Sequence, residues 1–252
     1  MGFQELLLSG IFVIIPLVIA VLLKLGLTRD IVIASVRSIV QLLIVGMILT
    51  FVFDSDSSIY MILMIIVMIG AASQNVIKKG TRIPGIKWII ILTLTAVEVI
   101  SMAIMLLFGI LDFEPEQIIP ISGMIIGNCM VLSLLFVSKF TDELENSEEM
   151  IELILSFGGE PKDAVSRSLK SAIQTSMIPT IESQKTIGLV QLPGMMSGLI
   201  IGGAAPMEAV MYQLLILFLI LTNATVASVM VGYLSYPKLF NSRLQYTGLK
   251  NE

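Results

Sequence analysis

Long apolar blocks alternate with short polar segments along the whole chain. Seven blocks are close to the roughly 20 residues that a helix needs to cross a bilayer core of about 30 Å. The predicted spans cover residues 6–23, 31–53, 59–77, 88–110, 118–138, 187–204 and 210–233. The sixth is the least regular, because its 18 residues include five glycines and Pro193. The pattern predicts an all-α polytopic membrane protein with about seven transmembrane helices in a single domain over residues 1–252.

The amino-acid composition excludes several classes of protein. Of 252 residues, 56% are hydrophobic and 13% are charged, whereas soluble domains average about 45–50% and about 25%. This excludes a cytosolic enzyme, a secreted disulfide scaffold and a disordered chain. The chain has no histidine and one cysteine, which excludes Ser-His hydrolysis, HExxH zinc chemistry and an internal disulfide. We expect no tight transition-metal site in this chain.

Basic residues gather on one side of the predicted spans. Fourteen of the 15 Lys and Arg residues lie after spans 1, 3, 5 and 7, and the opposite segments carry seven acids and no Lys or Arg. The remaining basic residue, Arg37, lies inside the second span near the same side. The positive-inside rule then places the N-terminus outside and the C-terminus in the cytoplasm. We expect a multi-pass protein of the cell's inner (plasma) membrane, surrounded by lipid and without a nucleic-acid partner.

The longest polar stretch, residues 139–185, predicts a cytoplasmic helical hairpin. Its first half, TDELENSEEMIELILSF, is expected to continue the fifth span as a helix. Gly158, Gly159 and Pro161 form the corner, because glycine ends helices and proline begins them. A second helix is expected over 162–178, ended or kinked by Pro179. The hairpin is either a solvated loop or a docking element for a cytoplasmic subunit.

One short pattern favours docking. Importer-type ABC permeases contact their ATPase through a Glu-Ala-Ala-x-x-x-Gly loop, and Glu152 and Gly158 have the same Glu-to-Gly spacing, although Leu153 and Ile154 replace the alanines. In this interpretation the ATPase-coupling corner comprises Glu152, Gly158, Gly159, Pro161 and Arg167. We expect Glu152 to contact the ATPase or Arg167.

Four longer stretches resemble the FetB-like family of bacterial permeases. They are IPTIESQKTIGLVQLPGMMSGLIIGG (178–203), VRSIVQLLIVG (36–46), IIPISGMIIGNCMV (118–131) and YLSYPKLFNSRLQ (233–245). The family is described as the membrane half of an iron-export ABC transporter, with plant relatives linked to aluminium tolerance. The resemblance implies a permease homodimer that works with a separate cytoplasmic P-loop ATPase. The sequence agrees with that division, because it contains no GxxxxGK[ST] motif. We expect no enzymatic activity and no cofactor in this chain, with ATP and Mg²⁺ on the partner subunit.

Polar residues inside the spans are candidates for the transport pathway. Arg37 and Gln41 share a helix face, either as an internal polar contact or with Arg37 reaching the cytoplasmic interface. Glu98 is the only acid deep in a span, so it is either neutral, paired or functional. If these residues coupled transport by themselves, the chain would be an ATP-independent secondary transporter or channel using Glu98 and Arg37. This is the alternative function.

Glycine patterns mark the fifth and sixth spans. Gly123 and Gly127 form one GxxxG, and Gly194, Gly198 and Gly202 form a longer one, a spacing typical of close helix packing within or between subunits. Interrupted Gly/Pro spans also line transport sites. We therefore expect the sixth span to line the pathway. The candidate pathway residues are Asn128 in the fifth span and Pro193, Met195 and Met196 in the sixth.

Overall fold

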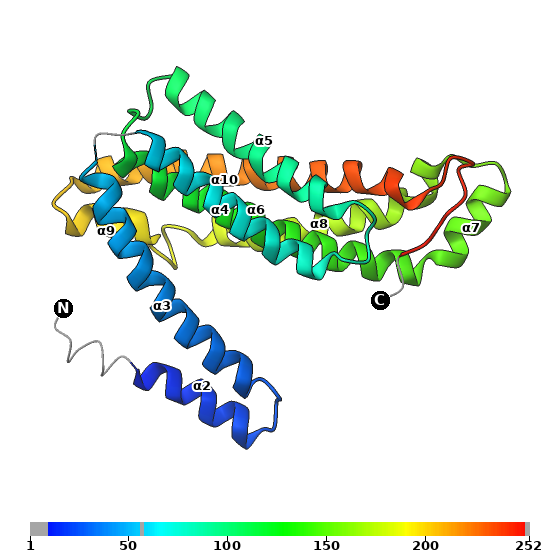
Figure 1. Cartoon of the computed structure of the whole chain (residues 1–252), viewed down its shortest axis with the longest axis horizontal. Coiled ribbons are helices and arrows are strands. Elements are labelled where there is room, and N and C mark those ends of the chain that lie inside the picture. The colour runs from blue at the N-terminus through cyan, green and yellow to red at the C-terminus, as the bar shows by residue number, and fades with distance from the viewer. Residues whose placement is uncertain (1–9, 56–57, 250–252) are drawn as a thin grey trace. The chain divides into compact units, whose positions relative to one another are not determined.

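The computed structural model describes residues 10–55 and 58–249 (Figure 1). Every regular element in these two ranges is a helix, which confirms the all-α prediction. They are α2 (Ile11–Leu22), α3 (Thr28–Phe53), α4 (Ser58–Lys79), α5 (Ile86–Leu107), α6 (Pro115–Asn146), α7 (Glu148–Ser156), α8 (Pro161–Thr186), α9 (Gly194–Ile201), α10 (Pro206–Ser235) and the 3-10 turn η1 (Tyr236–Leu239). The chain divides into two compact units, residues 1–57 and 58–252.

Five of the described helices are long and apolar enough to cross a membrane. They are α3, α4, α5, α6 and the run of α10 with η1. The shorter apolar helix α2 has 12 residues and lies within the predicted first span, whose residues 6–9 are outside the described part of the chain. The structure therefore supports a multi-pass helical membrane protein.

The predicted sixth span is wrong as a continuous helix. Only Gly194–Ile201 of residues 187–204 is helical, and eight residues span about 12 Å, far less than a bilayer core. The reason is local. Gly188 adopts a positive φ of 85°, and Pro193 is extended at φ −60°, ψ 146° immediately before α9. The break falls where the glycines and Pro193 made this span the least regular of the seven.

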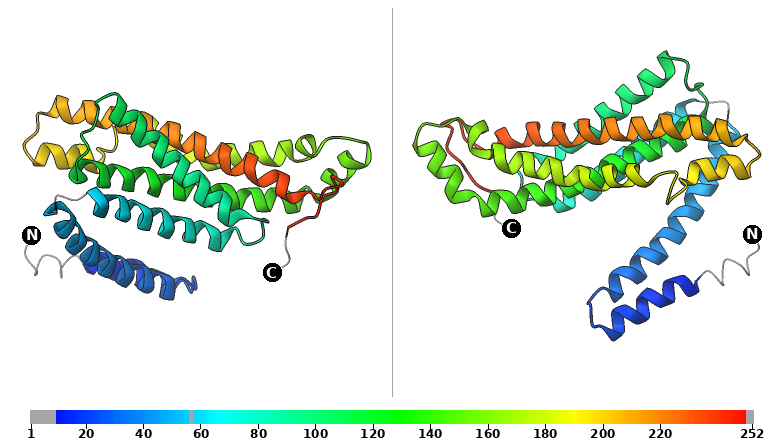
Figure 2. Two further views of the ribbon diagram at one scale, coloured as in Figure 1. Left: turned by 45° about the horizontal axis from the view of Figure 1, so that its top comes forward. Right: turned by 180° about the vertical axis from the view of Figure 1, so that it is seen from behind.

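The second unit is built around three long helices. Helices α6, α8 and α10 contact one another and run side by side, with α4 against α6 and α5 against α10 (Figure 2). Each of the three begins with a proline in its first turn, Pro115, Pro161 or Pro206, where the missing N–H costs no hydrogen bond and φ already suits a helix. Phe136 and Phe140 are fully buried and their rings stack at a centroid distance of 5.3 Å.

The hairpin between α6 and α8 is present, but its second helix is longer than predicted. Helix α6 continues to Asn146, α7 follows at once, and the chain turns back into α8. Helix α8 does not end at Pro179 but continues to Thr186. It contacts α6 and α10 along its length, and this packing outweighs the loss of one backbone hydrogen bond at the proline. The last turns of α8 thus lie beside an apolar part of α10. The predicted cytoplasmic segment, residues 139–185, had included these turns of α8.

The first unit is a helical pair with little internal core. Helices α2 and α3 contact each other, joined by a turn in which Gly26 has φ 71°. No residue in the most apolar 18-residue window of α3 is buried. Such a helix is stable where lipid or another chain covers it.

Candidate functional site

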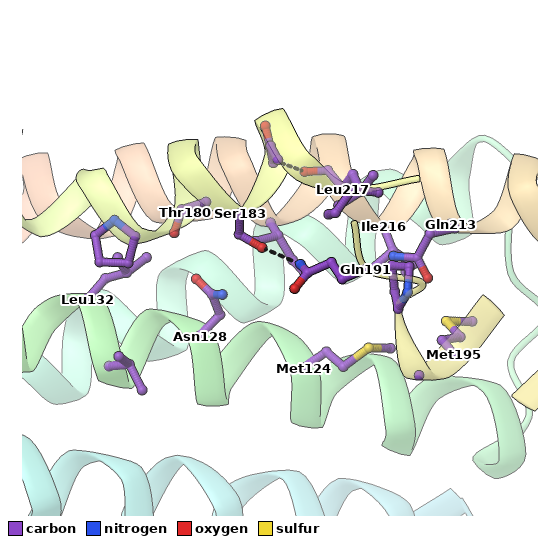
Figure 3. A pocket seen from close by; sticks show the side chains of 17 residues that line it. Met124, Asn128, Leu132, Thr180, Ser183, Gln191, Met195, Gln213, Ile216 and Leu217 are labelled. Atoms are coloured by element: carbon purple, nitrogen blue, oxygen red, sulfur yellow. Dashed lines mark hydrogen bonds between the residues drawn. The ribbon is translucent and has the colours of Figure 1, made fainter. Parts of the chain in front are cut away.

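A cleft of about 320 Å³ opens where α6, α8, α9 and α10 meet, and its mostly apolar wall contains six amide or hydroxyl side chains (Figure 3). Its wall combines three long helices with the loop 187–193 and the start of α9. The lining residues are Met124, Asn128, Val131 and Leu132 of α6, Pro179, Thr180, Ser183 and Gln184 of α8, Ile187, Gln191 and Pro193 of the loop, Gly194 and Met195 of α9, and Gln213, Ile216, Leu217 and Ile220 of α10.

The backbone break at the cleft is stabilised by its own hydrogen bonds. After α8 ends at Thr186, the Gly188 N–H donates to the Gln191 carbonyl at 3.0 Å, and Ile187 and Gln191 form an isolated bridge. The first bond of α9 runs from the Ser197 N–H to the Pro193 carbonyl at 3.0 Å. The end of one helix and the start of another therefore face the same cleft. Discontinuous helices of this kind form substrate sites in many transporters.

Amide and hydroxyl side chains supply the polar groups. The Gln191 Nε2 donates to Ser183 Oγ at 2.9 Å, as Figure 3 shows, and the Gln184 Nε2 donates to the Leu217 carbonyl at 2.8 Å. In contrast, Asn128 Oδ1 and Gln213 Oε1 are buried and have no hydrogen-bond partner. Gln213 is only 6% exposed. Most buried polar atoms have a partner. Described residues with an unpartnered buried atom also include Ser73, Thr93 and Glu98, but Asn128 and Gln213 are the two that line the cleft, where a bound molecule could supply a donor.

The cleft carries no formal charge. None of its lining residues is Lys, Arg, Asp or Glu. Within the described ranges, no group of three or more His, Cys, Asp or Glu side chains is placed to hold a metal ion. The chemistry available at this site is therefore hydrogen bonding by neutral groups, with thioethers of Met124 and Met195 beside them.

The cleft brings together some of the predicted pathway residues and leaves others apart. Asn128, Pro193 and Met195 line it, but Met196 does not. Arg37 and Gln41 lie in the first unit, on α3, where they line a shallow apolar groove.

Glu98 is enclosed rather than open to a cavity. It is 3% exposed, both carboxyl oxygens lack a hydrogen-bond partner, and the Ser122 side chain of α6 lies beside it. Close by, Ser101 Oγ donates to Asn223 Oδ1 at 2.8 Å and joins α5 to α10. Glu98 is not among the residues that line the cleft.

At the other end of the unit, the hairpin corner has the predicted backbone. Gly158 has φ 84°, a left-handed conformation that side chains other than glycine rarely adopt. Gly159 lies so close to the end of α7 that an added Cβ would be 2.5 Å from Ile154 Cγ2 and 2.9 Å from the Ile154 carbonyl oxygen. Pro161 then starts α8. The corner is a tight turn that depends on both glycines.

Ion pairs fix the polar surface around the hairpin. Lys139 Nζ contacts Glu143 Oε1 at 2.8 Å, and Ser171 Oγ donates to the same oxygen at 3.0 Å. These contacts, with the charge of Arg167, lower the pKa of Glu143. Arg167 thus lies near Glu143. Arg82 pairs with Glu145, which joins the α4–α5 turn to the end of α6.

Glu152 instead faces the C-terminal segment. It lines a groove of about 660 Å³ between α7, the corner glycines and residues 241–246. That segment turns tightly, since Asn241 Oδ1 accepts the N–H groups of Arg243 at 2.9 Å and Gln245 at 3.0 Å. Burial, together with Glu148, Glu145 and Glu152, raises the pKa of Tyr246 to about 12. The C-terminal segment lies along α7 in Figure 1.

The predicted packing glycines have mostly open surroundings. A Cβ added at Gly127, Gly194 or Gly198 would meet nothing within 4 Å. Gly123 approaches Met68 Cε, and Gly202 approaches only carbonyls of its own helix. Within the described chain, then, Gly123 alone among these five residues lies close to a side chain of another helix.

Sequence reasoning found Asn128 but missed the other polar side chains of the cleft. Thr180, Ser183 and Gln184 fell within the segment assigned to the cytoplasm, and Gln213 was not singled out. One signal was available for Gln213: it is the only amide in the apolar run of residues 209–221. Thr180 and Gln184 are also four residues apart, so they share a helix face.

Comparisons with known proteins cover nearly the whole chain. The sequence profile of the Uncharacterised protein family (UPF0014) matches residues 3–240. The UPF0014 membrane protein YjkA of Bacillus subtilis (strain 168) is 44% identical over 245 residues, 97% of this chain and 98% of that protein. The probable iron export permease protein FetB of Escherichia coli (strain K12) is 36% identical over 242 residues, 96% and 93% of the two chains. The protein ALUMINUM SENSITIVE 3 of Arabidopsis thaliana is 30% identical over 235 residues, 93% and 86%. No solved structure matches the chain.

Proposed function

Because the chain belongs to the UPF0014 family of multi-pass membrane proteins, we propose that it is the membrane-spanning permease subunit of an ABC transporter that exports iron or another metal species. The observation that carries the proposal is the uncharged cleft, with amide and hydroxyl groups in its wall, at the break between α8 and α9. The name of the relative FetB, a probable iron export permease protein, supports the class of substrate.

ATP hydrolysis belongs to a second chain in this proposal. The sequence has no P-loop, and the hairpin offers a surface for a partner. Met150, Leu153 and Phe157 follow one another along a face of α7 and are exposed, with Phe157 at 85%. An apolar stripe outside the predicted spans is typical of an interaction site. Acidic residues Glu149 and Glu152 lie beside it in sequence, so the ATPase is expected to present an apolar groove with basic groups at its rim.

The proposed topology keeps seven crossings with a modified sixth. The end of α8, the loop 187–193 and α9 together return the chain to the outer side, where α10 begins. The Arg82–Glu145 ion pair supports a common cytoplasmic side for the α4–α5 turn and the end of α6. The N-terminus is then outside and the C-terminus cytoplasmic, as the distribution of basic residues requires.

Two copies of the permease form the pathway in this proposal. The open surroundings of Gly127, Gly194 and Gly198 leave small-residue surfaces that a second copy can approach closely. The exposed loop residues Leu189, Val190 and Leu192 provide apolar surface near the same cleft.

The coupling corner tests the proposal. Gly158→Val places a β-branched side chain at φ 84°, which distorts the corner while leaving the buried core untouched. We expect it to reduce copurification of the ATPase about tenfold or more, or to uncouple ATP turnover from transport in nanodiscs. Gly109→Val is the matched control, because Gly109 also has positive φ and open surroundings but lies at the predicted outer end. Unchanged copurification and turnover in Gly158→Val, and in a deletion of residues 156–161, would show that the hairpin is only a loop.

A further inference from the structure

The cleft's chemistry restricts the form in which a metal can be bound. We propose that it takes the metal as an electroneutral complex with a small oxygen-rich ligand that carries hydroxyl or water donors, rather than as a bare or hydrated ion. This inference rests on the proposed function and deepens it by naming the substrate class of the same site.

The first argument is charge. The lining residues include no carboxylate, and no ligand cluster occurs elsewhere in the described ranges. An isolated ion is strongly disfavoured in a site of low dielectric without a counter-charge. Hard cations also prefer several oxygen ligands, usually with carboxylates among them. The neutralising charge must therefore arrive with the metal.

The second argument is the hydrogen-bonding capacity of the walls. Asn128 Oδ1 on α6 and Gln213 Oε1 on α10 are both buried and unpartnered, and both side chains lie at the cleft in Figure 3. Each is an acceptor, so the bound species must present donors on opposite sides. Hydroxyl groups and metal-bound waters are such donors.

The third argument comes from the start of α9. The N–H groups of Gly194, Met195 and Met196 precede the first helical bond, which begins at Ser197, and such groups have no partner within the helix. They lie at the positive end of the helix, and Gly194 and Met195 line the cleft. A bare cation would be repelled there, whereas anionic oxygens of a complex would be bound.

Size agrees with this assignment. Six waters around an ion occupy about 180 Å³ at about 30 Å³ each, and the cleft holds about 320 Å³. The remaining space accommodates a small multidentate ligand such as a hydroxycarboxylate.

Equilibrium binding of radiolabelled iron to the full chain in nanodiscs tests the inference. The probes are the 1:1 complex of Fe²⁺ with malate, in which two carboxylates balance the charge of the ion, hydrated Fe²⁺ alone, and malate alone, all under anaerobic conditions. We expect the complex to bind at least tenfold more tightly than hydrated Fe²⁺ or malate. Asn128→Leu and Gln213→Leu should each weaken its binding about tenfold, because each removes one acceptor. Asn75→Leu, an exposed amide on α4, is the control and should bind as the unchanged chain does.

A parallel measurement separates the inference from the proposed function. ATP-dependent iron movement in proteoliposomes containing the ATPase tests the function alone. Iron movement together with equal or tighter binding of hydrated Fe²⁺ would overturn the electroneutral complex but keep the transporter. If both leucine variants bind the complex as tightly as the unchanged chain does, the assignment to this cleft is overturned. Failure to bind either form of iron would also overturn it, and failure of iron movement as well would remove the function.

Discussion

The two halves of the α6–α8–α10 bundle use the same helices in opposite ways. Toward the hairpin, the helices are close-packed: Phe136 is fully buried, and a Cβ added at Gly232 would lie 2.6 Å from Leu169 Cδ1 and 3.0 Å from Phe136 Cζ. Toward the other end, the same helices separate around the cleft, and two amide oxygens there have no partner. The packed half keeps the three helices in position, and the open half leaves amide oxygens free to bind a ligand.

Side-chain size accounts for this difference. In the packed half, small residues Ala172 and Gly232 allow close approach of neighbouring helices, and aromatic rings fill the space between them. In the open half, Pro179 removes one backbone donor within α8, the helix breaks before Pro193, and amide side chains stand among the apolar residues of the wall. A bundle packed equally along its length would have no site, and one open along its length would have no stable frame.

The largest effect is expected from a substitution that disrupts the packed half of the bundle. Gly232→Val inserts a side chain where Leu169 and Phe136 leave no room, and overpacking of this kind costs about 3 kcal/mol. We expect a strong loss of monodisperse protein in detergent and a lower unfolding temperature. Gly198→Val is the comparison, because its Cβ position is open. It should leave the fold intact and reduce only the proposed dimer, as measured by light scattering. Equal stability of the two variants would contradict the contrast between the halves.

A smaller effect is expected for substitutions of Glu98. They test whether this enclosed acid behaves differently from the polar groups of the open cleft. Glu98 has unpartnered oxygens, as the cleft does, but it does not line the cleft. A carboxyl enclosed without a cation is stable only as the neutral acid, and Glu98 takes part in none of the ion pairs among the described residues. We therefore expect Glu98→Gln to change stability by less than about 1 kcal/mol and to leave iron movement and binding unchanged. Glu98→Lys, which adds a buried charge, should unfold the protein. Loss of ATP-independent transport in Glu98→Gln would favour the alternative of a secondary transporter that uses Glu98 and Arg37.

The smallest effect concerns the C-terminal segment against α7. The pKa of Tyr246 is raised to about 12, above its usual value of about 10, so the folded protein favours the protonated phenol. The contribution to stability is complete below pH 10 and is lost as pH rises from 10 toward 12. The difference in phenolate absorbance between the unchanged chain and Tyr246→Phe should show a midpoint well above pH 10. A midpoint at 10 would mean that the segment does not stay on α7.

Element types and approximate boundaries followed from the hydrophobic pattern, but the cleft did not. Blocks of apolar residues located α3 to α6 and α10, and Gly158 with Pro161 located the hairpin corner, because those signals are local. Thr180 and Gln184 could not be placed, since their polar character suggested solvent. Only packing of α8 against α6 and α10 shows that these side chains face an enclosed site. The glycines and Pro193 of residues 187–204 pointed to an interrupted span, but hydropathy gave no sign that only Gly194–Ile201 would be helical.

Helix α6 joins the two regions as one rod. It runs without a break for 32 residues from Pro115 to Asn146, and Asn128 lies 18 residues, or about 27 Å, from its hairpin end. A tilt of about 2° about that end would move Asn128 by about 1 Å. A hydrogen bond to Asn128 Oδ1 tolerates only about 0.5 Å of variation in distance. A partner that rocks the hairpin by this small angle would therefore be enough to release whatever the cleft holds.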